Sequence, residues 1–541
     1  MLHRLFSGLS SRARPLRGPI TGALLLGLLP FASAQAATIH IANGAEPGTL
    51  DPQKASGDWE TRITRELFEP LVGYDAQGEL TPGLADRWEV SDDGRTYRFH
   101  LREAQWSDGQ EITAADAVFA LRRLLAPQTA AYNANLYYPI EGAESVNRGD
   151  ATPDTLGVEA LDERTLEIRL TQPTAYFLQA MAMTESAPLP EHYIDQALDQ
   201  PGARWVIPGK LVVSGAFQLT AWTPQTEIRL EKNPSFHAAD QVKLDTAVLY
   251  PLDDAQAALN RFRTAEIDIS YLGVPSSQIG WARENLEHEL RINPILGEYY
   301  YVLNQREGST LADKRVREAL NLAVRREVIT DTILGMGQIP SYWYLPRAMS
   351  GNAGGTMGFM QEPLEQRLDR ARALLTEAGY GPGQPLELEI AYNTLEDHRK
   401  VAVAIAAMWR AIGIETRLTN RETAVHFATL RQGDFQVGRY GAIATVDDPF
   451  DLLSSFVTGA SGNYSGYTNP AYDQLVARST AELDPTRRAE LLTEAQQQLL
   501  DDYALVPLYD YVSTKLVSDR VQGWQGNPLD VHPLRYMSVT E

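Results

Sequence analysis

One complete strand–helix–strand unit can be recognised in LELEIAYNTLEDHRKVAVAIAAMWRAIGIETRL, residues 386–418. Residues 386–392 alternate apolar and polar side chains, which is typical of a half-buried strand. Residues 400–412 carry an apolar stripe at helical spacing and end at Gly413, and residues 414–418 alternate again. Short connections of this kind predict parallel strands joined by a right-handed crossover. The segment therefore predicts an α/β fold.

Alternating helices and strands continue on both sides of this unit. A helix is predicted at residues 363–378, because its apolar positions repeat at helical spacing. Asp484-Pro485 supplies an N-cap and a first-turn proline for a helix that reaches Leu500. Thr113, with Asp116 three residues later, is typical of a capped helix start. We expect the α/β class to extend over the whole chain.

The length of the chain predicts more than one domain. A chain of 541 residues is too long for a single hydrophobic core, so two or three domains are expected. Hydrophobic residues make up 44% of the chain, which is enough to form several cores. No flexible linker separates the predicted elements. Domains that share a chain without linkers are often discontinuous, so we expect the backbone to cross between them more than once.

Residues 1–36 have the pattern of a cleaved secretory signal peptide. Four arginines precede an apolar run at residues 20–31, and small residues follow at Ala34 and Ala36. The apolar run is too short to span a bilayer, which argues against a membrane anchor. No Cys follows it, so lipid attachment at this point is excluded. We expect the mature chain to begin near Ala37 and to work in the periplasm.

Composition excludes several classes of function. The net charge of −22 argues against nucleic acid or anionic lipid as a partner, since both require a positive surface. No other apolar run approaches membrane-spanning length, so direct membrane insertion is not expected. The chain contains no Cys, which rules out disulfides, thiol catalysis and thiolate metal sites.

Recognisable motifs for catalysis, metals and cofactors are absent from the sequence. The nine His are scattered, without the spacing of a metal site. In the segment 462–466, the first glycine lies one position too far from Ser465 to form a nucleophile elbow. Gly335-Met336-Gly337 lacks the third glycine of a dinucleotide-binding loop. We therefore expect a protein that is not an enzyme and that uses no cofactor and no metal.

Eight short segments occur in the order typical of a known family. They are residues 44–52, 67–71, 97–109, 214–217, 262–268, 315–320, 392–398 and 506–509. On these segments the chain resembles the family-5 solute-binding proteins of bacterial peptide ABC importers, in particular the periplasmic oligopeptide-binding proteins. The resemblance implies two hinged α/β lobes and an inserted third domain. It places lobe I at 37–67, 188–295 and 513–541, the inserted domain at 68–187, and lobe II at 296–512.

The resemblance also implies a function. Such a protein captures a short peptide, plain or modified, by closing its lobes, and delivers it as a monomer to an inner-membrane ABC permease. The ligand backbone pairs with protein strands, and its side chains enter wet pockets that adapt to many sequences. Three alternatives stay open: a non-peptide solute such as a metal chelate, haem, an opine or a sugar derivative; an extracytoplasmic hydrolase; and a chaperone.

Ligand contacts follow from the resemblance residue by residue. Backbone pairing is assigned to Ser56-Gly57-Asp58 and Tyr440-Gly441-Ala442, carboxylate binding to His398 and Arg439, and the cleft walls to Tyr132 and Tyr511. Four of these residues also have an ordinary structural explanation. As isolated tyrosines, Tyr132 and Tyr511 fit positions in a core or at a rim. Gly441 fits either a close approach of ligand backbone or a simple bend. His398 fits a surface position at the start of a helix.

One expected ligand group is missing from this chain. The family uses an Asp for the α-amino group of the ligand, and this chain has Thr445 there, whose hydroxyl cannot neutralise an ammonium. Asp447 lies two residues further on, on the same face of a continuing strand, and is one candidate replacement. The alternative is a ligand without a free α-amine, such as a modified peptide or cell-wall fragment. The other changed family positions are Thr423 and Ala442 for tryptophans, Leu334 for a lysine, and Gly297 with Ile443 for a cysteine pair.

Overall fold

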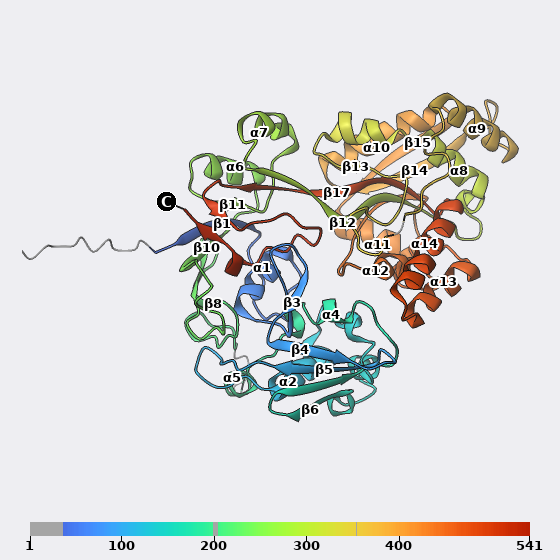
Figure 1. Cartoon of the computed structure of the whole chain (residues 1–541). Helices are drawn as coiled ribbons and strands as arrows, with labels where there is room; N and C mark the ends of the chain where they lie inside the picture. The colour runs from blue at the N-terminus through green and yellow to red at the C-terminus, as the bar shows by residue number, and fades with distance from the viewer. Residues whose placement is uncertain (1–35, 199–203, 353, 541) are drawn as a thin grey trace, which may run out of the picture. The chain divides into compact units, whose positions relative to one another are not determined.

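The computed structural model describes residues 36–198, 204–352 and 354–540 (Figure 1). The predicted signal peptide lies outside these residues. The described helices are α1 Asp58–Leu67, α2 Ala114–Leu125, α3 Ala143–Arg148, α4 Phe177–Ala180, α5 Glu191–Leu198, α6 Ala255–Arg263, α7 Ile279–Asn285, α8 Lys314–Ala323, α9 Leu364–Glu377, α10 Glu396–Arg410, α11 Thr423–Gln432, α12 Pro449–Leu453, α13 Pro470–Ala481 and α14 Pro485–Asp501. In the described part of the chain, every helix falls short of the length and apolarity needed to cross a membrane.

Strands from distant parts of the chain form one large sheet. Its order is β15 Ile414–Arg421, β14 Leu386–Asn393, β16 Val437–Ile443, β12 Leu290–Leu303, β17 Leu505–Val517, β11 Ile269–Ser270, β1 Thr38–Gly44, β10 Thr246–Pro251, β9 Glu227–Lys232 and β8 Phe217–Thr223, with β13 Ile339–Pro340 paired to β17. A separate sheet has the order β4 Ala85–Val90, β5 Thr96–Leu101, β7 Thr165–Arg169 and β6 Val158–Asp162. Two short pairs complete the set: β2 Val72–Tyr74 with β3 Leu80–Pro82, and β18 Val521–Gln522 with β19 Ser538–Val539.

The α/β prediction is confirmed where the sequence signals are clearest. The predicted strand–helix–strand unit forms β14, α10 and β15, and its two strands pair in parallel over eight residues. The helix start at Thr113 is also confirmed, because Asp116 Oδ2 accepts hydrogen bonds from the Thr113 N–H and hydroxyl at 2.8 and 3.1 Å. Helix α10 begins four residues before the apolar stripe, since Glu396 and Asp397 suit the first turn of a helix.

Two long antiparallel strands run through the large sheet. Figure 1 shows β12 and β17 side by side over most of their length. Their register shifts between Pro294 and Glu298, a stretch that contains a proline without an N–H and ends next to Gly297. A shifted register interrupts the ladder of hydrogen bonds, so this stretch is a place where the two strands can bend.

Separate cores form on the two sides of this stretch. One core is built from buried residues between positions 296 and 509. A second collects residues between 71 and 182, together with Val212 and Val531. The remaining buried residues pack around β1, β8, β9 and β10 and around α6 and α7. The chain therefore buries its apolar side chains in several groups, and segments distant in sequence contribute to each group.

Candidate functional site

A cavity of about 320 Å³ brings together segments that are far apart in the sequence. It is lined by residues from 52–74, 132–133, 182–185, 295–296, 443–445 and 528–531. Among the predicted site residues, Ser56, Asp58, Tyr132 and Thr445 line it. Tyr132 is 71% exposed and the neighbouring lining residue Ile443 is 63% exposed. Large apolar side chains left open in a cavity are typical of a surface that a ligand covers.

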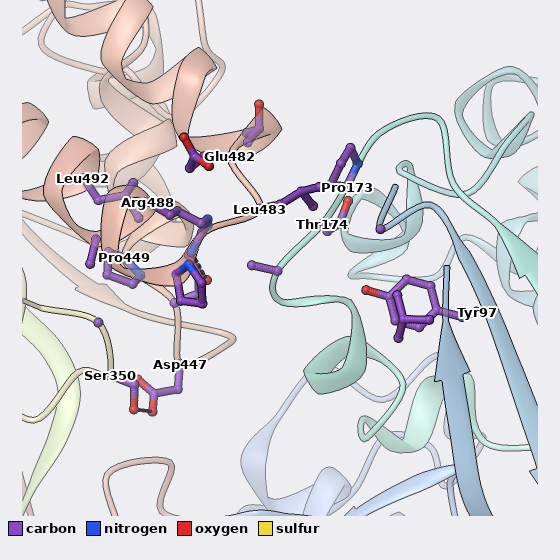
Figure 2. A pocket seen from close by; sticks show the side chains of 18 residues that line it. Tyr97, Pro173, Thr174, Ser350, Asp447, Pro449, Glu482, Leu483, Arg488 and Leu492 are labelled. Atoms are coloured by element: carbon purple, nitrogen blue, oxygen red, sulfur yellow. Dashed lines mark hydrogen bonds and ion pairs between the residues drawn. The ribbon is translucent and has the colours of Figure 1, made fainter. Parts of the chain in front are cut away.

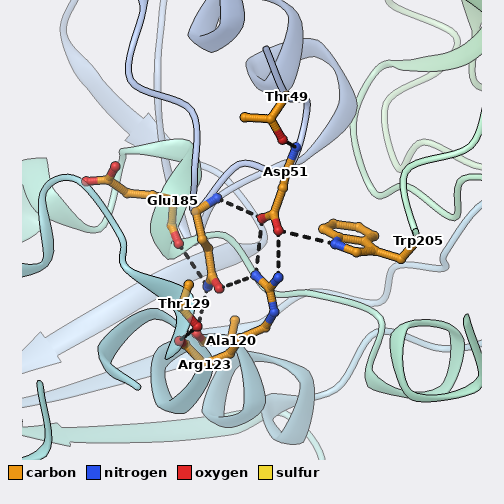
Figure 3. Close-up of polar contacts among 8 residues, drawn as sticks. Thr49, Asp51, Ala120, Arg123, Thr129, Glu185 and Trp205 are labelled. Atoms are coloured by element: carbon orange, nitrogen blue, oxygen red, sulfur yellow. Dashed lines mark hydrogen bonds and ion pairs between the residues drawn. The ribbon is translucent and has the colours of Figure 1, made fainter. Parts of the chain in front are cut away.

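A buried ion pair holds the wall of the cavity that contains Ser56 and Asp58. Figure 3 shows Arg123 of α2 donating to both carboxylate oxygens of Asp51, at 2.6 and 3.1 Å. The indole N–H of Trp205 donates to the same carboxylate at 3.2 Å, and Gln53 donates to the carbonyls of Ala120 and Glu185. Because both charges of the ion pair are paired and hydrogen-bonded, this wall is rigid.

The carboxylate of Glu60 then fixes the start of α1. Its Oε1 accepts the N–H groups of Gly48 and Thr49, at 2.8 and 3.1 Å. Its Oε2 accepts those of Ser56 and Gly57, also at 2.8 and 3.1 Å. The amides predicted to pair with a ligand backbone at these two residues are thus already bonded within the protein. At this end of the wall, Ser56 can offer a ligand its carbonyl oxygen.

Strand β16 has an open edge beside the cavity. Its neighbour β14 pairs with it only at Val437 and Gly438, whereas β12 pairs along its full length. The N–H of Ala444 donates to the Leu296 carbonyl of the extended β12 segment, so even-numbered residues of β16 face β12. The N–H and C=O groups of Gly441 and Ile443 therefore face the other edge, where no described strand lies. An open strand edge is the element to which an extended peptide adds as a further strand.

The structure tests one of the two reasons predicted for glycine at position 441, the bend, and leaves the close approach of a ligand backbone as a prediction. Its backbone is not in the left-handed region, so a bend does not require it. A Cβ atom placed there would collide with the hydroxyl of Tyr511 and lie 3.0 Å from Nη2 of Arg439. Glycine at this position leaves room for the Tyr511 hydroxyl and the Arg439 guanidinium, which lie against the strand.

Arg439 lies in a buried group of tyrosines. Its Nη2 donates to the Tyr511 hydroxyl at 2.5 Å, its Nη1 donates to Asn393 at 3.3 Å, and its guanidinium lies 4.7 Å from the ring centre of Tyr299. Burial lowers the pKa of the guanidinium, but the surrounding tyrosines raise it more, so the cation is maintained. No carboxylate within the described residues forms an ion pair with Arg439, and Nε of this residue has no hydrogen-bond partner there. The group is a charged donor without a counter-ion.

His398 is buried, so its alternative explanation as a surface histidine is wrong, and its predicted role in carboxylate binding stays a prediction. It is 7% exposed, and its Nδ1 shares a hydrogen bond of 3.3 Å with the Tyr299 hydroxyl. Burial lowers the pKa of His398 to about 3, with further lowering by Arg439 and His426. The imidazole is therefore neutral at physiological pH. It can help to hold a carboxylate through a hydrogen bond, while the positive charge comes from Arg439.

Asp447 does not share a strand face with Thr445, because β16 ends at Ile443. Its carboxylate accepts hydrogen bonds from the N–H and hydroxyl of Ser350, at 2.7 and 2.6 Å. Figure 2 shows this pair at a different cavity, of about 350 Å³, which none of the other predicted site residues lines. The backbone of Asp447 is also bonded on both sides to the Gln179 amide. Thr445 lines the first cavity with an exposed side chain, whereas Asp447 does not line that cavity. The N–H of Thr445 donates to Asp451 at 2.6 Å.

The changed family positions have local structural explanations. Gly297 and Ile443 are direct partners in the β12–β16 register, so the predicted cysteine positions do face each other. An Ile443 side-chain atom lies 3.2 Å from the place of a Cβ at Gly297, so the isoleucine fills the space above the glycine. Leu334 is buried in a core, and Thr423 is exposed at the first position of α11. Ala442 faces β12 with its backbone and is half-buried.

Sequence reasoning missed several polar residues that line the first cavity. Arg62 and Arg65 lie on α1, Glu185 lies in the short 3-10 helix Thr184–Ser186, and Asp530 lies near the C-terminus. The spacing of Asp58, Thr61, Arg62 and Arg65 matches one face of a helix and could have indicated a polar α1 face turned toward a cavity. Glu185 and Asp530 had no local signal, because their position depends on distant segments.

The comparisons with known proteins agree with this architecture. A model of the family described as "Bacterial extracellular solute-binding proteins, family 5 Middle" matches residues 79–464. The periplasmic oligopeptide-binding protein OppA of Salmonella typhimurium LT2 is 35% identical over 493 residues, which cover 90% of each chain. The probable deoxycholate-binding periplasmic protein YgiS of Escherichia coli K12 is also 35% identical, over 90% of this chain and 91% of that protein.

Solved structures show the same likeness. The unliganded open form of the periplasmic murein tripeptide-binding protein MppA matches with a TM-score of 0.82 at 32% identity, covering 94% of this chain and 98% of that one. OppA of Haemophilus influenzae, in complex with the peptide RPPGFSPFR, matches with a TM-score of 0.77 at 34% identity, covering 94% and 99%. These likenesses extend over nearly the whole of each chain.

Proposed function

The chain belongs to the bacterial extracellular solute-binding proteins of family 5, and from this premise we propose that it binds short peptides beside strand β16 and delivers them to an ABC importer. The observation that carries the proposal is the open edge of β16 at Gly441 and Ile443, next to a cavity with exposed Tyr132. Main-chain pairing satisfies the N–H and C=O groups of a peptide of any sequence. A peptide backbone is the ligand that such an edge fits.

The basic group around Arg439 supports the same function. A buried guanidinium that has no counter-ion among the described residues is a suitable partner for the terminal carboxylate of a peptide, and its planar donors match that group. His398 adds a neutral hydrogen-bonding group on the same tyrosine cluster. In this proposal the carboxylate lies at Arg439 and the extended backbone follows the β16 edge.

The location and partners are part of the proposal. The relatives named above are periplasmic proteins, which supports a periplasmic location for this chain and agrees with the predicted signal peptide. The receiving partner in the proposal is an inner-membrane permease of an ABC importer. The cores support lobe I at 37–67, 188–295 and 513–541, an inserted domain at 68–187, and lobe II at 296–512.

The experiment compares tri-alanine with its C-terminal amide, by calorimetry of the mature protein. The wild type should bind the free acid at least about ten-fold more tightly than the amide, because amidation removes the anion that Arg439 pairs with. Arg439→Gln should remove this difference. The matched control is Arg410→Gln, which removes an exposed arginine on α10 and should keep it. Failure of both peptides to bind the wild type would refute peptide binding.

N-acetylated tri-alanine tests how the ligand's amino group is held. Asp447 is bonded to Ser350, and Thr445 carries no charge, so the segment after β16 offers the amino group no ion pair. We therefore expect acetylation to weaken binding by less than about ten-fold, since no charged contact of this segment is lost. A much larger loss would show that a carboxylate holds the amine after all.

The second candidate is a non-peptide solute in the same cavity. The relative YgiS, named as a probable deoxycholate-binding protein, is as similar to this chain as OppA is. Mass spectrometry of the ligand released by denaturing the purified protein separates the two candidates. Recovery of added peptide in intact form would also count against a hydrolase, in keeping with a family of binding proteins.

A further inference from the structure

Helix α1 turns a polar face toward the cavity. Asp58, Thr61, Arg62 and Arg65 all line it, and their spacing of three, four and seven residues places them on one side of the helix. The opposite side of α1 packs into a core through Ile63, which is fully buried. Packing of the apolar side therefore fixes the orientation of the polar one.

The two arginines on this face differ in their contacts. Arg62 is held in place, because its Nε and Nη2 donate to the side chain and carbonyl of Asn43 at 3.0 and 2.6 Å. Its guanidinium also lies 4.2 Å from the ring centre of Tyr271. Arg65 is partly buried, yet its side chain has no hydrogen bond or ion pair with any residue in the described part of the chain. Its donors are left for a group inside the cavity.

The acidic residues around Arg65 do not neutralise it. Burial raises the pKa of the adjacent Glu66 to about 7, so this carboxyl carries only part of its charge at neutral pH. Glu69 is paired with Arg535 at 2.6 Å, and Asp530 with Lys515 at 2.9 Å. Asp58 lies seven residues away, about 10 Å along the helix. Burial lowers the pKa of Arg65, and the raising effect of Glu66, Tyr271, Tyr74 and Asp58 offsets this only in part.

We propose that Arg65 binds a second carboxylate of the ligand, that of an acidic side chain, and so makes the protein prefer acidic peptides. The inference rests on the proposed function and names a substrate class for it. Arg65 lines the cavity beside the β16 edge, whereas Arg439 does not, so the two cations can hold two separate carboxylates. A guanidinium with free donors binds a carboxylate through two parallel hydrogen bonds. In the complex, the ligand's carboxylate supplies the negative charge that no described residue places against the Arg65 side chain.

The test uses alanine tripeptides that carry Glu at position one, two or three, each compared with its Gln twin. Calorimetry of the wild type should show at least a ten-fold preference for Glu at one of the three positions. Arg65→Gln should reduce that preference to about one, and Arg65→Lys should retain part of it. Arg410→Gln, which removes an exposed arginine elsewhere, should leave it unchanged. Because the Arg65 side chain has no bonding partner among the described residues, the Tm of Arg65→Gln without ligand should not fall below that of the wild type.

Each other outcome contradicts the inference. Equal binding of Glu and Gln peptides at all positions, or a preference that persists in Arg65→Gln, would overturn it while leaving peptide binding intact. Repeating the series with C-terminal amides tests the source of the carboxylate. If Arg65→Gln lowers the affinity only for peptides with a free C-terminus, Arg65 binds the terminal carboxylate. The assignment to a side-chain carboxylate is then wrong. If no peptide binds the wild type, the proposed function fails and this inference fails with it.

Discussion

At the scale of single residues, the candidate site is made of charged and polar groups that the protein leaves incompletely partnered. Arg439 is buried among tyrosines without a counter-ion, and Arg65 has no hydrogen bond or ion pair within the described residues. Uncompensated buried charges destabilise a folded protein, so their presence in a site indicates a ligand of opposite charge. His398 shows the complementary case, in which burial removes the charge from the side chain itself.

The neutral state of His398 predicts how stability depends on pH. Its pKa is about 3 in the folded protein and 6.5 when unperturbed, so the unfolded chain binds the proton first as the pH falls. The free energy of unfolding should therefore decrease below pH 6.5, by about 2 kcal/mol at pH 5 from this residue. The His398→Gln variant should lack this pH-dependent part of the free energy of unfolding. Urea unfolding at pH 8 and pH 5 measures the difference.

The control for this prediction is His288→Gln, at an exposed histidine in the segment after α7. It should keep the wild-type difference between the two pH values. An unchanged difference in His398→Gln would mean that the imidazole is already charged in the folded state.

At the scale of elements, local capping and the end of strand pairing shape the two walls of the cavity. The start of α1 depends on Glu60, which satisfies four backbone N–H groups at once. The edge of β16 stays open because β14 ends its pairing at Gly438. The start of α1 therefore has its backbone donors occupied, whereas the β16 edge presents free backbone donors and acceptors to a ligand.

Removing the Glu60 carboxylate should destabilise the protein. Glu60→Ala leaves four N–H groups without an acceptor, and we expect the free energy of unfolding to fall by about 3 kcal/mol. Glu60→Gln should restore part of this loss, because an amide oxygen can still accept two of the bonds. Chemical denaturation measures both variants, with the exposed Glu287→Gln as a control that should change stability by less than about 0.5 kcal/mol. Equal stability of Glu60→Ala and the wild type would contradict this role.

The open edge of β16 can be tested by removing one backbone donor. Ile443→Pro eliminates the N–H that faces this edge, and we expect peptide affinity to fall about ten-fold relative to Ile443→Ala. The alanine variant is the matched control, because it also loses the exposed side chain but keeps the N–H. Calorimetry with tri-alanine measures both. Equal affinities of the two variants would show that the ligand does not pair with β16.

At the scale of the whole molecule, β12 and β17 join parts of the chain that have separate cores. Their register shift between Pro294 and Glu298 lies next to residues 295 and 296, which line the cavity. A ligand that contacts both α1 and β16 favours an arrangement that brings those contacts together. The register shift in the paired strands and the cavity therefore lie next to each other.

Ligand binding should make the molecule more compact. We expect the radius of gyration, measured by small-angle X-ray scattering, to decrease when saturating tri-alanine is added, because closure is favoured only by contacts on both sides of the cavity. The control is free alanine, which has no peptide bond. Added at the same concentration, it should leave the radius of gyration unchanged. Identical scattering with and without the tripeptide would contradict closure.

The sequence by itself determined the α/β class, the strand–helix–strand unit at 386–418 and the capped start of α2. These features depend on residues a few positions apart, whose periodicity and hydrogen bonds are local. Only the tertiary structure decided that His398 is buried, that Asp447 bonds Ser350 and that the Tyr511 hydroxyl lies against Gly441. It also decided that Arg65 faces a cavity and that its side chain bonds no other residue in the described ranges. These properties depend on where strand pairing ends and on which distant segments meet, and no local pattern in the chain carries that information.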